Sequence, residues 1–521
     1  MFWADRVASE VEERFGKGTA LVIRDEKTLS GRVHVGSMRG AAIHGAVSHA
    51  LSERGISNTF FWEHNDFDPM DDIPVYLDRA TFEPFLGMPL KNVPSPDPSS
   101  ANFAEYFAKD FQSVIEEAGF HPTFYRGSEL YLSGKMDGVI REALLGAEII
   151  RRIYREVSGS KREETWLPIN MLCPQCGKIT TTRADTFDGE VVHFVCKVDA
   201  VAYTKGCGYE GTLSPFGGNA KLPWKVEWPA KWKVMGVQVE GAGKDHSTKG
   251  GSRDVASHIS KEVFNYEPPF DVPYEFFLVG GKKMSSSKGR GSSAREIADL
   301  MPAKIFRLAL LGKDINQAFN FDPEGETIPV LYDLYDKLAE SYAAGVRDDF
   351  ARLFEFVEGK DFSQVYTPRF SQVAFISQMP HMDFLSEIAT LKGSPLTPAD
   401  VAEATERKVY ALKWLELYAP EKFVFKLQDS LPEVAKTLSD VQKKALQSLK
   451  LFIESTPAMP SGEDLHHKLH SLKEEVPIAP ADLFSSLYLV FLGKTFGPKA
   501  GWFLSVLDRE FVLVRLGEAA Q

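Results

Sequence analysis

The sequence is poor in several features that would each assign it to a particular class of protein. Cysteine is scarce, with four residues among 521, all of them in the segment 173–207. Secreted domains that rely on disulfides carry more cysteines and spread them along the chain, so we expect a reducing, cytoplasmic location. Positive charge is not in excess, since 60 Lys and Arg oppose 72 Asp and Glu. A uniformly basic nucleic-acid coat is therefore excluded, although a local basic surface is not.

Long apolar runs are also missing. The best candidate is the segment 483–493, which is short and interrupted by Ser485 and Ser486. A membrane-spanning helix needs about 18 or more apolar residues in succession, so we expect no membrane span. The first residues mix apolar and acidic side chains, and they do not have the basic-then-apolar order of a secretory signal.

What the chain does contain is an ordinary globular composition arranged in segments of different texture. Apolar residues make up 44% and charged residues 25%, and the length predicts about two to four domains. Up to about residue 160, short β-like runs alternate with helical patterns, which indicates a parallel sheet covered by helices. The next segment is rich in Cys, Gly, Pro and Trp and is typical of an insertion. Strand and helix patterns return after it.

From about residue 324 the β signal fades and helical patterns dominate. The segment 431–456 shows this most clearly, because its apolar residues fall on one helical stripe: Val434, Leu438, Val441, Ala445, Leu449 and Phe452. We therefore predict an α/β protein with a Rossmann-type parallel sheet, an insertion that splits it, and a following all-α domain. The predicted divisions are 1–160, 161–234, 235–323 and 324–521.

The first chemical signal is SGRVHVGS, Ser30 to Ser37, between a strand-like run and a long helical pattern. Glycine after a strand lets backbone N–H groups and a helix N-terminus approach a phosphate closely. The imidazole of His34 could then donate to a phosphoryl oxygen as charge develops there. The alternative for this segment alone is a turn with a surface histidine.

The second signal is GGKKMSSSKGRG, Gly280 to Gly291, which follows a buried strand-like run. Its lysines can supply positive charge to a triphosphate, and its serines and backbone can supply hydrogen-bond donors. The alternative is a solvated basic linker. A third signal is GAGKDHSTKGGSRD, Gly241 to Asp254, where small residues, Asp245 and His246 follow another β-like run. A ligand site at a sheet edge needs such residues.

The four cysteines suggest a metal site. Cys173 and Cys176 form a C-x2-C knuckle, which is a strong zinc signature because the turn directs two thiolates at one ion. Ten residues separate Cys196 from Cys207, where a second C-x2-C would be expected. We predict one structural, four-thiolate zinc site. The alternatives are a partly degenerate site or reduced free thiols.

Together these segments resemble a family. HVGS, KMSSS about 250 residues later and a split parallel sheet are similar to the two signatures of class I aminoacyl-tRNA synthetases. KDH followed by GGS, KMSSSKG, LPWKVEWPAKW, and GPKAGWFLSVLDREFVLVRL resemble the class I lysyl-tRNA synthetases in particular, as do FWEHNDFDPMDDIP and FLGMPL. The resemblance runs through nearly the whole chain.

The resemblance implies ATP-dependent activation of L-lysine and transfer to tRNA(Lys), with Mg²⁺ accompanying ATP and an anticodon-binding role for the helical domain. It implies catalytic roles for His34, Gly36, Ser37, Lys283 and Lys288. It implies ATP binding by Gly31, His34, Gly36, Gly243, Asp245, His246, Met284, Ser285, Ser286 and Ser287. A lysine pocket needs aromatic walls and a carboxylate, and the candidates are Glu26, Thr28, Trp224, Trp228, His246 and Tyr274, with core packing as the alternative for each Trp.

The sequence departs from the family pattern in two places. Ser37 stands where the usual motif has a second histidine, so any role of that histidine is supplied elsewhere, and His246 is one candidate. The stretch 96–107 has Asp97 but neither Cys nor His, so we predict that a second metal site of some relatives is absent. We further expect several basic residues to face the acceptor end of the tRNA: Lys221, Lys225, Lys231, Lys233, Lys249 and Arg253.

Two other functions remain open from the sequence. A small-molecule nucleotidyltransferase of the same fold would share the H-x-G motif and adenylyl chemistry, but it needs neither a zinc insertion nor a large helical domain. A non-catalytic, zinc-containing tRNA-binding protein would not need the KMSSS and KDH segments.

Overall fold

The computed structural model describes residues 1–281, 292–379 and 382–521, which form two compact units. The first unit comprises residues 1–321 and 344–362, and the second comprises 322–343 and 363–521. None of the described helices combines the length and the apolar character that crossing a bilayer requires.

A parallel sheet forms the centre of the first unit. Its strands are β1 (Leu21–Thr28), β2 (Asn58–Asn65) and β3 (Thr123–Arg126), in the order β1-β2-β3. Parallel bridges from Ile23 to Val239 and from Val239 to Phe270 extend the sheet beyond β1. A second parallel pair joins β9 (Phe277–Val279) and β10 (Phe319–Phe321). The predicted α/β class with a parallel sheet is thus confirmed.

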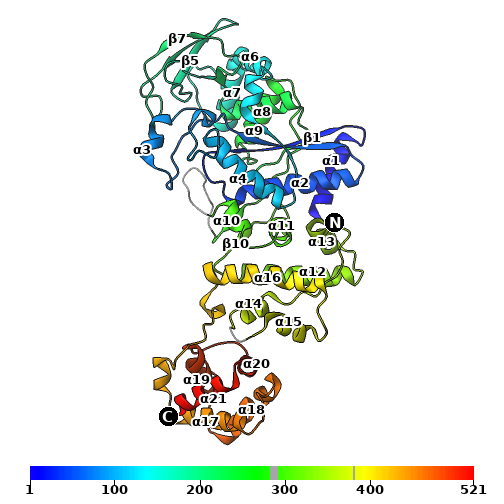
Figure 1. Cartoon of the computed structure of the whole chain (residues 1–521). Helices are drawn as coiled ribbons and strands as arrows, with labels where there is room; N and C mark the ends of the chain where they lie inside the picture. Colours follow the sequence, from blue (N-terminus) through cyan, green and yellow to red (C-terminus); the bar gives the residue numbers. More distant parts are fainter. Residues whose placement is uncertain (282–291, 380–381) are drawn as a thin grey trace. The chain divides into compact units, whose positions relative to one another are not determined.

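Helices cover both faces of this sheet (Figure 1). Asp25 and Trp62 face α2 (Met38–Glu53) and α4 (Phe103–Glu117), since Asp25 approaches Gly40 and Trp62 lies 5.7 Å from Phe111. The opposite face carries α8 (Trp224–Met235), which packs against α9 (Ser252–Glu262). The other helices of this unit are α1 (Trp3–Phe15), α3 (Arg79–Phe82), α5 (Gly127–Leu132), α6 (Asp137–Leu145), α7 (Ala147–Ser158), α10 (Ala294–Ala298), α11 (Ala303–Leu311) and α13 (Asp349–Glu358).

The segment between α7 and α8 is built from short antiparallel strands. β5 (Thr182–Phe187), β6 (Val192–Cys196) and β7 (Glu210–Leu213) form one sheet, and β4 (Asn170–Met171) pairs with β8 (Ala220–Lys221). Phe194 and Val192 are buried in a core shared with α6 and α7. The segment therefore packs on the sheet unit.

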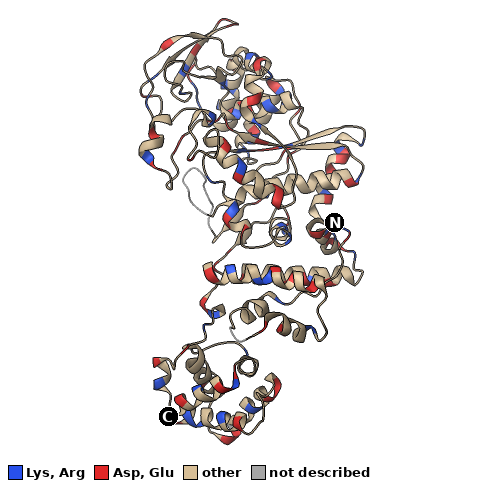
Figure 2. Cartoon of the chain, viewed as in Figure 1, with Lys and Arg blue, Asp and Glu red and all other residues tan. Residues whose placement is uncertain are grey.

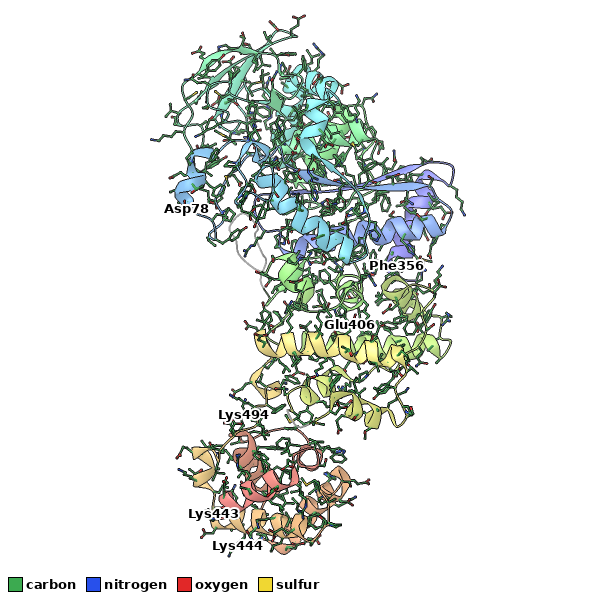
Figure 3. The ribbon with its side chains drawn as sticks, in the orientation of Figure 1. Asp78, Phe356, Glu406, Lys443, Lys444 and Lys494 are labelled. Atoms are coloured by element: carbon green, nitrogen blue, oxygen red, sulfur yellow. The ribbon has the colours of Figure 1, made fainter. Side chains whose placement is uncertain are left out.

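Among the described residues of the second unit, helices are the only regular secondary structure. Its helices are α12 (Thr327–Ala343), α14 (Phe370–Ile376), α15 (Phe384–Lys392), α16 (Pro398–Leu417), α17 (Asp440–Glu454), α18 (Gly462–Glu475), α19 (Pro480–Leu492), α20 (Ala500–Ser505) and α21 (Arg509–Ala520). Acidic and basic residues are both distributed along α16 (Figure 2). Lys443 and Lys444 lie on α17 (Figure 3).

The helical stripe predicted over 434–452 is wrong at its beginning. Ser439 caps α17 and forms a capping box with Gln442, so the helix begins at Asp440. Val434 lies before the helix in a 3₁₀ turn and is 45% exposed. The buried face is formed by Ala445, Leu446, Leu449 and Ile453.

Candidate active site

A cavity of about 350 Å³ lies at the carboxyl ends of β1 and the neighbouring segments of the sheet. Parallel α/β sheets place ligands at this edge. Eleven of the residues predicted from the sequence line it: Glu26, Thr28, His34, Gly36, Ser37, Trp224, Trp228, Gly243, Asp245, His246 and Tyr274. The cavity therefore unites segments that are more than 200 residues apart.

Some predicted residues do not line the cavity or cannot be placed. Gly31 is not among the lining residues, and its φ of 148° suits the glycine of a loop that leads to His34. The predicted ATP-binding role of Gly31 stays a prediction. The rest lie outside the described residues: Lys283, Met284, Ser285, Ser286, Ser287 and Lys288.

The loop that carries His34 is hydrogen bonded to the residues that directly follow the GGKKMSSSKGRG segment. The N–H of Val35 donates to the carbonyl of Ser292 at 3.2 Å, and that of Ala294 donates to Val33 at 2.8 Å. A Cβ at Gly36 would lie 2.9 Å from the His34 ring and 3.2 Å from the Phe277 carbonyl oxygen, so a side chain at this position would displace the ring of His34. The first motif thus lies beside the residues that flank the second.

An ion-pair network that the sequence analysis missed lies beneath the cavity. Arg24 is fully buried and contacts Glu26 and Glu63 at 2.5 Å and Glu240 at 2.8 Å. The buried Lys231 contacts Glu63 at 2.5 Å. Burial alone would raise the pKa of Glu26, but Lys231 and Arg24 together hold it well below its usual range. Glu26 is therefore ionised at the cavity wall.

This network contradicts part of the expectation for the tRNA acceptor end. Lys221, Lys231 and Arg253 are 4%, 0% and 5% exposed. Lys221 pairs with Asp68 at 3.1 Å and also with Glu227. Arg253 donates to the carbonyl oxygens of residues 240 and 269. These three cations support the sheet and cannot face RNA.

Tryptophans at positions i, i+4 and i+8 form one face of α8. The rings of Trp224 and Trp228 stack with their centroids 5.4 Å apart and their planes 15° apart. The indoles of Trp228 and Trp232 both donate to the carboxylate of Glu240, at 3.1 and 2.5 Å. His246 lies edge-on to Trp224 at 5.3 Å. Burial raises the pKa of Glu240, although Arg24 and the indole of Trp228 oppose this.

Tyr274 and Asp25 meet at the first turns of α2. A Cβ at Gly40 would lie 2.3 Å from Asp25 Oδ2 and 2.9 Å from the Tyr274 hydroxyl. Both side chains can therefore lie against the helix only because position 40 has no side chain. Burial, together with Asp25 and Glu240, raises the pKa of Tyr274 well above its usual value. Tyr274 is thus a neutral hydrogen-bonding group in the cavity.

The four cysteines lie together away from this cavity. Their Sγ atoms are within 4.8 Å of one another, with Cys173 to Cys207 at 3.6 Å and Cys176 to Cys196 at 3.7 Å. Gly206 permits the irregular spacing, because a Cβ there would lie 2.4 Å from the carbonyl oxygen of residue 197. The ten-residue loop thereby returns Cys207 to Cys196.

Comparison with known proteins identifies the family. Residues 1–360 match the family model described as tRNA synthetases class I (K). A lysine–tRNA ligase of Methanosarcina barkeri (strain Fusaro / DSM 804) is 34% identical over 99% of this chain and 97% of its own length. One from Thermoplasma acidophilum is 32% identical over 99% and 98%. A solved glutamate tRNA ligase from Elizabethkingia meningosepticum CCUG26117 is 13% identical with a TM-score of 0.46, covering 96% of this chain and 99% of that chain.

The family model and the lysine–tRNA ligases that match this chain agree with the class predicted from the sequence. The chain belongs to the class I tRNA synthetase family, in the group designated K, and is an aminoacyl-tRNA ligase. The match over most of the chain decides against the small-molecule nucleotidyltransferase and the non-catalytic tRNA-binding protein.

Proposed function

We propose that this enzyme is a lysine–tRNA ligase. It activates L-lysine with ATP to lysyl-adenylate and pyrophosphate, and it transfers the lysyl group to the terminal adenosine of tRNA(Lys). The observation that carries the proposal is the cavity, which combines carboxylates and aromatic walls with the His34 loop. The activity for which the archaeal relatives are named supports it.

The cavity suits a substrate with an apolar stem and a terminal cation. Asp25, Glu26 and Glu240 line it, and the network keeps Glu26 ionised. Trp224 and Trp228 provide stacked faces, and an ammonium over such a face gains up to about 2 kcal/mol when it is desolvated. The four methylenes of lysine would lie along these rings while a carboxylate receives the ammonium. Thr28 and His246 would lie on this side of the cavity, and Tyr274 would close the pocket from the side of α2.

The other side of the cavity suits ATP. His34, Gly36 and Ser37 lie at the beginning of α2, where backbone N–H groups favour an anion. Gly243, Asp245 and His246 would contact the nucleotide, together with the predicted loop residues Lys283 to Lys288. As the lysine carboxylate attacks the α-phosphate, His34 would donate to the phosphoryl oxygens on which charge accumulates. Mg²⁺ would accompany ATP, bound through its phosphates.

A structural zinc ion in the insertion 161–234 is part of this proposal. Zn–S bonds of about 2.3 Å in a tetrahedron place sulfurs roughly 3.8 Å apart, which the two Sγ distances of 3.6 and 3.7 Å support. Four thiolates would fill the coordination sphere, so the ion stiffens the insertion and takes no part in catalysis. Clustered reduced thiols also fit a cytoplasmic location.

The helical domain 324–521 would bind the anticodon of the tRNA. The net charge of −12 opposes a polyanion, so binding needs a localised basic surface and should weaken steeply with salt. Lys225, Lys233 and Lys249 remain candidates for the acceptor end. Lys249 is exposed, and Lys233 is bound to Glu142 at 2.7 Å.

Amino-acid-dependent ATP–pyrophosphate exchange tests the proposal. The assay compares lysine with arginine, ornithine and glutamate, each with and without tRNA(Lys). We expect exchange with lysine only, because ornithine is one methylene too short and glutamate meets like charge in the cavity. Exchange that prefers another of these amino acids would overturn the lysine assignment.

A further inference from the structure

The cavity contains few groups that can neutralise a phosphate. Among the lining residues in the described part of the chain, the only Lys or Arg side chains are Lys27 and Arg39. Arg39 is fully buried, and its guanidinium donates to the carbonyl oxygens of Leu310, Lys313 and Asp314, the last at 3.0 Å. These hydrogen bonds hold α2 to the end of α11 and to the residues that follow it. Within the described residues, Lys27 is therefore the lining cation that is available to a ligand.

Lys27 has no direct partner among the described residues. Its ammonium makes no ion pair and no hydrogen bond with any residue that the structure describes, and the charges that act on it are those of Asp25 and Asp68. Burial lowers the pKa of Lys27, and these two carboxylates offset only part of that effect. An ammonium that is partly removed from water without a partner costs free energy, which an incoming anion would recover.

The position of Lys27 on β1 places it below the beginning of α2. Side chains alternate along a strand, so Lys27 shares a face with Asp25, which contacts Gly40 in α2. Two residues advance the strand by roughly 6.6 Å toward its carboxyl end. There the chain turns through Val35–Ser37 into α2, and helix beginnings favour anions. Glu26 and Thr28 lie on the opposite face, with the network and Glu240.

We propose that Lys27 binds a phosphate oxygen of ATP in this cavity and supplies the positive charge that Ser37 does not provide. This rests on the proposed function. In the activation step, a carboxylate oxygen of the amino acid forms a bond to the α-phosphorus. The bond from that phosphorus to the oxygen bridging to the β-phosphorus breaks, and this oxygen leaves with the electron pair on pyrophosphate. Lys27 stabilises the negative charge that accumulates there.

The alternation of side chains also separates this role from binding of the amino acid. The proposed pocket for the substrate side chain lies on the face of Glu26, Trp228 and Glu240, whereas Lys27 lies on the face of α2. A change at Lys27 should therefore alter the chemical step and the affinity for nucleotide or pyrophosphate. The affinity for lysine should change little.

The test compares Lys27→Gln and Lys27→Arg with Lys135→Gln, a matched control at an exposed position. Exchange is measured with tRNA present while ATP, pyrophosphate and lysine are varied in turn, and thermal denaturation checks folding. Removing one such group at a developing oxyanion lowers kcat about 100-fold. We expect that loss for Lys27→Gln with the KM for lysine unchanged, recovery of most activity in Lys27→Arg, and no effect in the control.

Three results would overturn the proposal. The first is an unchanged kcat in Lys27→Gln, and the second is an effect of Lys27→Gln on the KM for lysine alone. The third is an equal loss of kcat in Lys27→Gln and Lys27→Arg when both variants are well folded. If Lys27→Gln does not fold, acetylation of Lys27 in the unmodified enzyme is followed by mass spectrometry, and α,β-methylene ATP should protect it. Absence of protection would also overturn the proposal. If the enzyme exchanges with another amino acid, the same variants are assayed with that one, so failure of the lysine assignment is distinguished from failure at Lys27.

Discussion

Replacing Arg24 by Met should destabilise the first unit strongly, because three carboxylates converge on this buried guanidinium. Arg24 and Glu63 are both fully buried, and Glu26 and Glu240 lie within 2.8 Å of the same side chain. Lys231 would then be the cation left in ion-pair contact with Glu26 and Glu63. Removing one partner of a buried ion pair costs about 3–5 kcal/mol, since the remaining charge is left without compensation.

Hydrogen exchange of the amides of β1, followed by mass spectrometry, measures the loss of stability at this strand. Because the measurement is local, it does not require that a chain of two units unfold in a single two-state step. Where exchange of an amide requires opening of the structure, a loss of about 3 kcal/mol in the free energy of opening makes the exchange more than a hundredfold faster. The double variant Arg24→Met/Glu63→Gln also removes the negative charge of Glu63, so it should recover part of the stability that Arg24→Met loses. The control is Arg79→Met, whose pair with Glu83 is exposed and 4.0 Å long, and it should cost at most about 1 kcal/mol.

The pH dependence gives an independent check on the same variant. Arg24 contributes to the lowered pKa of Glu26, while burial already raises that of Glu240. Without Arg24, burial should raise the folded-state pKa of Glu240 further above that of the unfolded chain, and the pKa of Glu26 should rise from its lowered value. A group whose pKa is raised in the folded state stabilises that state less as the pH rises. The loss of stability caused by Arg24→Met should therefore grow between about pH 5 and pH 8. A deficit equal to that of Arg79→Met, or one that shrinks with rising pH, would refute this reasoning.

Other predictions concern the catalytic loop, the pocket, the metal and the helical domain. His34→Ala should lower the rate of adenylate formation much more than lysine affinity, as single-turnover kinetics and lysine titration would show, and equal losses would contradict its role. Trp224→Ala should raise the KM for lysine by roughly 5- to 30-fold with a smaller change in kcat, whereas Trp224→Phe should retain most affinity. Metal analysis of purified protein should find about one zinc per chain, which Cys176→Ser should lose, and finding none in protein prepared without chelator would refute the site. Deletion after about Glu324 should abolish aminoacylation of full-length tRNA, and a folded truncation that still discriminated tRNA(Lys) by its anticodon would contradict the domain assignment.

The cavity was largely predictable because its residues follow strands of a parallel sheet. Glu26 and His34 follow one strand-like run and Asp245 and Tyr274 lie beside two others, and the carboxyl ends of such strands meet at one edge. The helical class of the second unit was predictable from periodicity alone. The beginning of α17 was not, because the apolar stripe continued through Val434 while the capping box at Ser439 decided the boundary.

The roles of the buried cations were not predictable from composition. Lys231 lies in a run of Lys and Trp that resembles a basic surface, but its partner Glu63 is 168 residues away. Arg24 and Glu240 are separated by 216 residues. Only the pairing of the strands and the packing of α8 bring these charges together, so residue type and local spacing cannot distinguish an RNA-binding lysine from a buried one. For the same reason, the return of Cys207 to Cys196 depends on a loop closure that the spacing alone does not encode.

The stacked tryptophans of α8 also give the enzyme an intrinsic optical signal. Trp224 is 37% exposed at the cavity, while Trp228 is 4% exposed and hydrogen bonded to Glu240. With centroids 5.4 Å apart, the two indoles couple electronically, and a cation placed against one alters the field on both. Occupancy of the pocket by an ammonium should therefore change the emission and the near-ultraviolet circular dichroism of this pair. Substrate binding could thus be followed in solution without a label, even before ATP is added.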